Sequence, residues 1–143
     1  MDDFEACANR LKKYLDDLRE FEGSDLSGKK DYYAASMLAF SAINESLRAA
    51  ELLMAEEAMP APATYREMMG ILAGKQAISA HLAGRMKLLV TTRNMIAHEY
   101  GEIMPKDVSG FISKSGTLRE FIAALMRRRE GRKQRKNGRN GKK

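Results

Sequence analysis

Residues 79–100, SAHLAGRMKLLVTTRNMIAHEY, are the stretch that decides how this chain folds. Apolar residues recur every three or four positions along it, which is the spacing of an α-helix with one buried face. Ser79 stands where it can cap the first turn, and Gly101 follows the last position of the stripe. The stretch therefore predicts one amphipathic helix.

The same periodicity predicts further helices on both sides. Pro60 and Pro62 stop the second of them, because proline cannot continue a helix. Thr64 and Glu67 have the spacing of a capping box at the start of the third. A kink or break is expected at residues 113–116, where a glycine weakens the last helix. The expected helices cover about residues 3–21, 31–57, a short segment from 64 onward, 79–100 and 105–125.

The composition favours a single all-α domain. The chain has 143 residues, 44% of them hydrophobic, with three prolines and no tryptophan, and this length is enough to bury a core. No stretch alternates apolar and polar residues as a strand does. We therefore predict an up-and-down bundle of four or five helices over residues 1–126.

The positive charge is concentrated in the C-terminal segment. Residues 127–143 hold ten Lys and Arg against one Glu, whereas residues 1–126 hold fifteen against eighteen Asp and Glu. The segment has no apolar side chain, so we predict a disordered basic tail. Such a tail binds phosphate backbones without sequence preference, and its candidate targets are RNA, ribosomes and an acidic partner protein. The alternative is a solubilising extension or a cloning remnant.

Cysteine usage and hydropathy indicate a cytoplasmic protein. No run approaches the roughly 18 apolar residues of a membrane span, and the acidic N-terminus differs from a signal peptide. The single cysteine, Cys7, cannot form an internal disulfide. We therefore expect a cytoplasmic location and no contact with a membrane.

Arg93, Asn94, His98 and Tyr100 are the candidate functional residues. Histidine titrates near neutrality, so His98 could accept the proton of an RNA 2′-hydroxyl or deliver one to the leaving oxygen. The forked donors of Arg93 could stabilise charge on the phosphoryl oxygens. Asn94 could bind phosphate or orient His98. Because no acidic cluster accompanies them, we expect RNA cleavage without a metal ion or any other cofactor.

A simpler interpretation is open for the same residues. Cations near a helix C-terminus interact favourably with the helix dipole, which would make Arg93 and His98 ordinary last-turn residues. Arg93, however, lies on the apolar stripe, where a guanidinium needs a partner or a groove. Five residues at about 100° each separate Arg93 from His98 by about 140° around a helix. Either the helix ends before His98, or a second copy of the chain completes the site.

The pattern Arg93-Asn94-x-x-Ala97-His98-x-Tyr100 resembles the signature of the HEPN superfamily, specifically its HepT-like toxin branch. The resemblance extends over roughly residues 30–125, which makes it more specific than a lone motif. The other segments that carry it are Tyr65-Arg66-Glu67, Ile71-Leu72-Ala73, Ile78-Ser79, Leu82-Ala83, Arg85-Met86 and, in the second helix, Glu45.

This resemblance implies a HEPN-like homodimer that acts as a metal-independent endoribonuclease toxin. Its substrate would be RNA, with tRNA and mRNA as candidates, and attack by the 2′-hydroxyl would leave a 2′,3′-cyclic phosphate. It also implies a partner, an MNT-type minimal nucleotidyltransferase antitoxin, which adds AMP to the motif tyrosine, here Tyr100. In this scheme Arg93 and His98 are catalytic, and Asn94 is an orienting residue.

Two other functions stay open at this point. The first is a non-catalytic subunit that binds nucleotide or substrate for a separate minimal nucleotidyltransferase, with Arg93 holding a phosphate. The second is a purely structural helical dimer. Outside the motif, His81 is expected to be a surface residue and Cys7 a small core residue.

Overall fold

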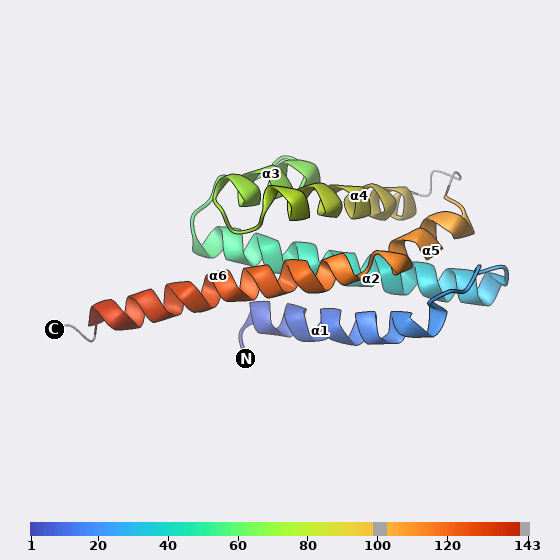
Figure 1. The fold of residues 1–143 in the computed structure, drawn as a ribbon, viewed down its shortest axis with the longest axis horizontal. Coiled ribbons are helices and arrows are strands. Elements are labelled where there is room, and N and C mark those ends of the chain that lie inside the picture. Colours follow the sequence, from blue (N-terminus) through green and yellow to red (C-terminus); the bar gives the residue numbers. More distant parts are fainter. Residues whose placement is uncertain (99–102, 141–143) are drawn as a thin grey trace.

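A computed structural model of the chain describes residues 1–98 and 103–140, and within these ranges it contains six α-helices, one short 3₁₀ helix and no strand (Figure 1). The all-α bundle predicted from the sequence is confirmed. The elements are α1 (Asp3–Leu18), η1 (Arg19–Phe21), α2 (Lys29–Glu56), α3 (Tyr65–Gly74), α4 (Ala80–Ala97), α5 (Pro105–Ser113) and α6 (Gly116–Asn140).

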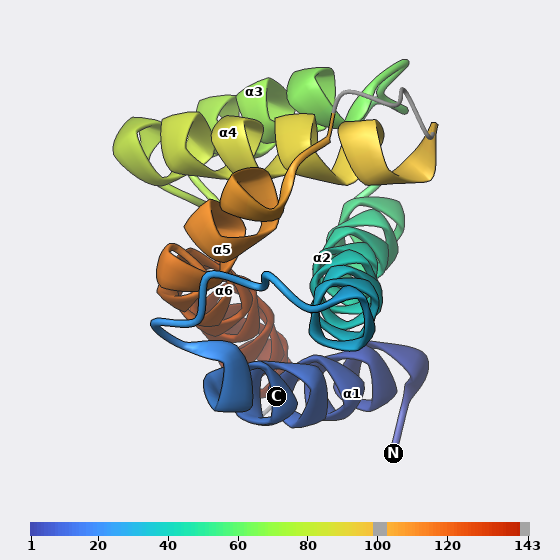
Figure 2. The ribbon, with the colours of Figure 1, turned by 90° about the vertical axis from the view of Figure 1, so that its right-hand side faces the viewer.

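The helices form three layers, which Figure 2 shows in a view along the long axis of the bundle. α1 lies on one side, α2 and α6 lie in the middle, and the α3–α4 pair covers the opposite side. Each helix turns an apolar stripe inward, and the removal of these side chains from water is the main force that holds the layers together. Fully buried members of this core include Leu11, Ile43, Leu47, Leu72, Met86 and Phe121.

Side-chain caps begin three of the helices. Asp2 and Glu5 form a capping box at α1, and Ser79 accepts a hydrogen bond from the backbone N–H of Leu82 at the start of α4 (3.0 Å). Thr64 caps α3 in the predicted way, by accepting from the N–H of Glu67 (3.0 Å). The Glu67 carboxylate, however, accepts from the N–H of Ala63 (3.0 Å). In the predicted capping box, Glu67 would accept from the N–H of Thr64. In the structure it accepts from the N–H of the preceding residue, Ala63.

Two predicted boundaries can be compared with the structure. The break expected at residues 113–116 is confirmed, since α5 ends at Ser113 and α6 begins at Gly116. The helix predicted over 79–100 ends earlier, at Ala97, and His98 is its C-cap residue. Residues 99–102 lie outside the described part of the chain, and Tyr100 is among them.

The C-terminal segment differs from the prediction of disorder from Arg127 onward. Within the described residues, α6 continues as a helix to Asn140 and passes beyond the ends of its neighbours (Figure 1). Arg128 and Arg129 attach this part of α6 to the bundle by ion pairs with Glu57 and Glu56. Composition alone could not reveal these pairs, because their members are more than 70 residues apart.

None of the helices in the described residues has both the length and the hydropathy needed to cross a membrane.

Candidate functional site

Arg93 lies in the last turns of α4 and reaches toward α2. Its Nε donates a hydrogen bond to Oδ1 of Asn44 (3.1 Å), and its Nη1 donates one to Oδ1 of Asn94 (3.0 Å). The side chain is half-buried. The partner expected for a guanidinium on the apolar stripe is thus a pair of neutral amide oxygens, one from each helix.

Two aromatic rings complete the surroundings of Arg93. The central carbon of the guanidinium lies 4.9 Å from the ring centroid of Tyr65 on α3 and 5.5 Å from that of Phe40 on α2. Both distances are within the roughly 6 Å at which the face of a ring attracts a cation. Three helices therefore hold Arg93, and its orientation depends on how they pack.

Among the described residues, no carboxylate lies close enough to neutralise the charge of Arg93. In the part of the chain that the structure describes, no Asp or Glu oxygen lies within 4.0 Å of it. Amide oxygens and ring faces stabilise a cation without cancelling its charge. Arg93 therefore carries a full positive charge at a half-buried position, where electrostatic attraction for an anion is stronger than in bulk water.

An open groove with a volume of about 710 Å³ lies beside Arg93, between α4 and the start of α3. Asn94 and His98 line it from α4, one helical turn apart, as their spacing predicts. His98 is exposed at the end of the helix, where its backbone N–H still bonds to the carbonyl of Asn94 (3.1 Å). The other lining residues are Glu51, Pro62, Ala63, Thr64, Tyr65 and Met68.

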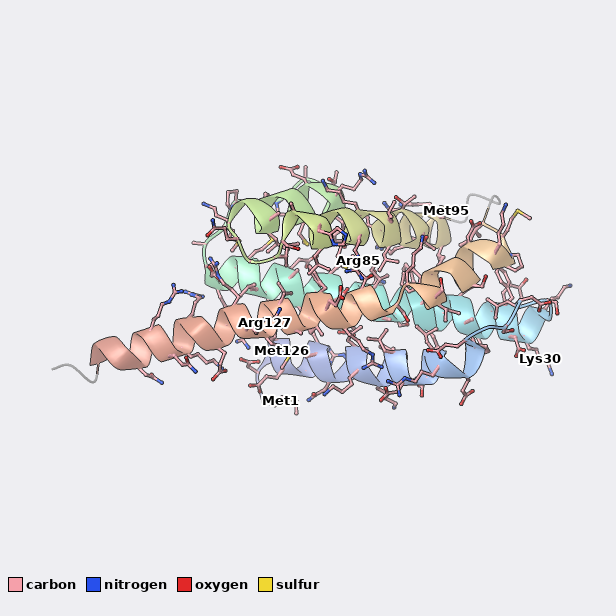
Figure 3. All side chains as sticks on the ribbon, viewed as in Figure 1. Met1, Lys30, Arg85, Met95, Met126 and Arg127 are labelled. Atoms are coloured by element: carbon pink, nitrogen blue, oxygen red, sulfur yellow. The ribbon has the colours of Figure 1, made fainter. Side chains whose placement is uncertain are left out.

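Asn94 connects the two residues that helix geometry separates. Its side-chain Oδ1 accepts a hydrogen bond from Arg93, while the residue itself lines the same groove as His98. Asn94 therefore contacts Arg93 at the edge of the groove that His98 also lines. Figure 3 marks this end of α4 by Met95, with Arg85 about three turns earlier on the same helix.

His81 and Cys7 lie away from this groove. His81 is exposed in the first turn of α4, about 25 Å from His98 along the helix axis. Cys7 is buried in α1, and burial raises the pKa of its thiol. Tyr100 falls outside the described residues.

Comparison with known families decides the classification. The sequence profile of the family described as "Ribonuclease HepT-like" matches residues 4–125. The chain belongs to the HepT-like ribonuclease family. The match confirms the resemblance expected from the Arg93–Tyr100 motif and extends it to include α1. Comparison with curated protein sequences finds no match.

Solved structures with the same HepT-like bundle share little sequence with this chain. A cytosolic protein of unknown function, YutE from Bacillus subtilis, superposes with a TM-score of 0.78 at 17% identity, over 91% of this chain and 92% of that one. A chain from a crystal structure of a toxin–antitoxin with AMP-PNP superposes with a TM-score of 0.70 at 18% identity, over 87% of this chain and 99% of that one. At such identities the likeness concerns the fold.

Glu45, which the HepT-like resemblance singled out, has a different place in the structure. Its Oε1 accepts a hydrogen bond from Nε of Arg10 (2.8 Å), which ties α2 to α1. Its Oε2 is buried without a hydrogen-bond partner among the described atoms. Glu45 therefore contributes to the joint between α1 and α2, and it does not line the groove beside His98.

Phe40 and Asn44 are site residues that sequence reasoning missed. They lie four positions apart on α2, so both face α4. A signal was available, since a phenylalanine and an asparagine share one face of a helix there. It could not be interpreted, however, because nothing in the sequence shows which face of α2 meets Arg93.

Proposed function

We propose that this HepT-like protein is a metal-independent endoribonuclease toxin, that its site is the groove beside Arg93 and His98, and that it acts in the cytoplasm. One observation carries the proposal. A half-buried arginine whose close partners among the described residues are neutral lies at the edge of a groove lined by an exposed histidine. That combination provides a phosphate-binding charge next to a group able to transfer protons.

The chemistry follows from these two side chains. His98 takes the proton from an RNA 2′-hydroxyl, and the 2′-oxygen attacks the adjacent phosphorus. The bond from phosphorus to the 5′-oxygen breaks, and that oxygen takes a proton from water or from the protonated His98 of the second copy. The products are a 2′,3′-cyclic phosphate and a 5′-hydroxyl. Arg93 stabilises the charge on the non-bridging oxygens, and Asn94 keeps Arg93 in place.

A second copy of the chain is proposed to complete the site. Tyr33 and Met37 are 65% and 64% exposed on α2, although both are large and apolar. At about 100° per residue they share a face with Phe40 and Asn44, the α2 neighbours of Arg93. An apolar strip that runs into the site favours a homodimer in which two Arg–His pairs meet.

The proposed partner is an MNT-type nucleotidyltransferase antitoxin, which silences the toxin by adding AMP to Tyr100. The toxin–antitoxin described above, with its nucleotide analogue, supports this part through likeness of fold, and the motif places Tyr100 two residues after His98. An added AMP would bring negative charge to the place where an RNA phosphate must bind. Tyr100→Phe should remain an active nuclease that the antitoxin no longer inhibits, and mass spectrometry should find no adenylyl group on it.

The direct test is cleavage of total RNA and of tRNA by the purified protein in the presence of EDTA. We expect cleavage by the wild type and its loss in His98→Ala. His81→Ala is the matched control, because it removes the other histidine of the chain, exposed near the opposite end of α4. Product ends should be 2′,3′-cyclic phosphates. Cleavage that requires an added divalent ion would contradict the metal-independent mechanism.

The same assay addresses the rival function, a non-catalytic nucleotide-binding subunit of a separate nucleotidyltransferase. If protein shown by mass spectrometry to carry no AMP on Tyr100 cuts no RNA, the nuclease proposal fails. Nucleotide binding that is lost in Arg93→Ala and kept in His98→Ala would then favour the regulatory subunit.

The dimer is tested by sedimentation. Met37→Glu places a charge on the proposed contact face and should yield a monomer with reduced cleavage. Met126→Glu is the control, because Met126 is also exposed (51%) but lies on α6 near the N-terminus of the chain (Figure 3). Dimers that persist in Met37→Glu would exclude this face as the interface.

A further inference from the structure

Between residues 128 and 138 of α6, all the cationic side chains lie on one side of the helix. At about 100° per residue, six cations fall within roughly 160° of the helix circumference. The opposite side carries Glu130, Gln134 and Asn137. We call the cationic side the α6 stripe, which consists of Arg128, Arg129, Arg132, Lys133, Arg135 and Lys136.

The first two members of the stripe fix the direction of the helix. Arg128 forms an ion pair with Glu57 (2.8 Å) and donates to the carbonyl oxygen of Lys75 (3.0 Å). Arg129 is paired with both Glu56 and Asp2 (2.7 Å each), and its guanidinium lies 4.3 Å from the ring centroid of Phe4. These contacts join α6 to the ends of α1 and α2, so the helix beyond them has a defined orientation.

The other four members have no such partners. Arg132, Lys133, Arg135 and Lys136 are exposed, and no carboxylate of the described residues lies within 4.0 Å of them. Together with Arg129 and Glu56 they line a groove of about 740 Å³. Glu56 is the groove's acidic residue, and its charge is already paired with Arg129. The free face of the groove is therefore strongly positive.

We propose that the α6 stripe binds the phosphate backbone of a nucleic acid, as a binding site separate from the groove at His98. Neighbouring cations on one helix face are about 5–6 Å apart, so one helix can contact several phosphates in succession. The two sites lie toward opposite ends of the long axis, because α4 ends toward one end of the molecule and α6 toward the other (Figure 1). The stripe would hold an RNA chain while another part of it enters the cleavage site.

The composition of the stripe favours a nucleic acid, and not an acidic protein, as its ligand. Residues 130–140 contain no apolar side chain at all. Protein interfaces carry an apolar or aromatic centre, whereas nucleic-acid interfaces are polar and positively charged. The stripe is polar and positively charged and has no apolar centre, so it resembles a nucleic-acid interface.

The test measures binding, so it is independent of the proposed cleavage. The probe is a fluorescent 2′-O-methyl oligouridylate of about 20 nucleotides, whose modified 2′-oxygen cannot attack phosphorus. The test variant is R132Q/K133Q/R135Q/K136Q in the full chain. Its matched control, K12Q/K13Q/K29Q/K30Q, removes the same charge from exposed lysines of α1 and α2. Thermal melting should show that both variants keep the bundle intact.

We expect the α6 variant to bind the probe at least tenfold more weakly at low salt, and the lysine control to bind nearly as the wild type does. Loss of four phosphate contacts should reduce the slope of log K against log salt by about 3 for a single strand. His81→Ala, exposed and outside both grooves, should bind like the wild type. Equal loss in both four-site variants would show attraction by net charge alone and would overturn the proposal.

A charge-exchange variant tests the stripe itself. R132Q/R135Q combined with Gln134→Arg and Asn137→Arg keeps the net charge and moves two cations to the opposite side of α6. Weaker binding than the wild type is expected, and unchanged binding would overturn the proposal of an oriented surface. Polyglutamate is the competitor that represents an acidic protein. If it binds the wild type as tightly as the oligonucleotide does and depends on the same four residues, the assignment to nucleic acid is overturned.

Discussion

Arg93 and Arg129 both lie against an aromatic ring, but their hydrogen-bond acceptors differ in charge. Each guanidinium lies over an aromatic ring, Tyr65 for Arg93 and Phe4 for Arg129, at 4.9 Å and 4.3 Å from the ring centroid. Among the described residues, the close acceptors of Arg93 are the amide oxygens of Asn44 and Asn94. Those of Arg129 are the carboxylates of Glu56 and Asp2.

The acceptors decide what each arginine can do. Carboxylates neutralise Arg129, and the hydrogen bond to Glu56 raises the pKa of its guanidinium, so the charge is used to join α6 to the bundle. Amide oxygens orient Arg93 and leave its charge available to an anion. A buried or half-buried arginine is thus a structural contact when its partners are acidic, and a candidate binding residue when they are neutral.

The largest effect is expected from removing the available charge. Arg93→Ala should lower the rate of RNA cleavage by about 10²–10³-fold, since one preorganised donor at a developing charge contributes about that much. Single-turnover cleavage assays measure it. Arg66→Ala, on the exposed side of α3, is the control and should cleave as the wild type does. If the cleavage rate of Arg93→Ala falls only in proportion to the fraction of folded protein, Arg93 has no direct role in cleavage.

Giving Arg93 an acidic partner should make it resemble Arg129. Asn44→Asp places a carboxylate at the acceptor that lies 3.1 Å from Nε, so an RNA phosphate must compete with it. We expect cleavage to fall about tenfold while the fold is retained. Asn9→Asp, exposed on α1, changes the net charge equally and should have no effect on the rate. Unchanged cleavage in Asn44→Asp would break the comparison between the two arginines.

Arg129→Met is the reverse case, because it should affect stability and leave catalysis alone. The variant loses the bonds to Glu56 and Asp2, and the free energy of unfolding should fall by about 1–3 kcal/mol. Chemical denaturation measures this change, and cleavage per folded molecule should stay constant. Arg127→Met, exposed on the other side of α6, is the control. A stable variant with impaired cleavage would reverse the roles assigned to the two arginines.

The smallest expected effect is on how the stability of the fold depends on pH. The hydrogen bond from Arg129 lowers the pKa of Asp2 below its ordinary 3.8. A carboxyl whose pKa is lower in the folded state contributes stability that is present above 3.8 and is lost as the pH falls toward the folded value. Asp2→Asn should keep the helix cap but remove this pH dependence. Melting temperatures measured from pH 6 to pH 2 should therefore fall less steeply for Asp2→Asn than for Asp3→Asn.

Helix positions could be predicted from the sequence because their signals are local. Apolar spacing, Ser79, Thr64 and the glycine at 116 each act within a few residues, and the helices begin or break there. The end of α6 could not be predicted in the same way. Its segment has no apolar residue, and the carboxylates that hold Arg128 and Arg129 come from α2 and from the N-terminus of the chain.

Only the part of the candidate site that is local in sequence could be predicted. Arg93, Asn94 and His98 are neighbours in sequence, so the motif identified them together, and their assigned roles stay predictions. Asn44, Phe40 and Tyr65 come from other helices and define the state of Arg93. The prediction that Arg93 needs a partner was sound, but the neutral character of that partner depends on packing.

By itself the sequence determined the helical class, most helix boundaries and the candidate site residues, because periodicity, caps and a short motif act over single turns. Only the tertiary structure decided which charges remain available. It brought amides to Arg93 and carboxylates to Arg129, and it left four cations of the α6 stripe exposed. Whether a charge is neutralised depends on which groups from distant segments lie within a few ångströms of it, and chain folding sets those distances.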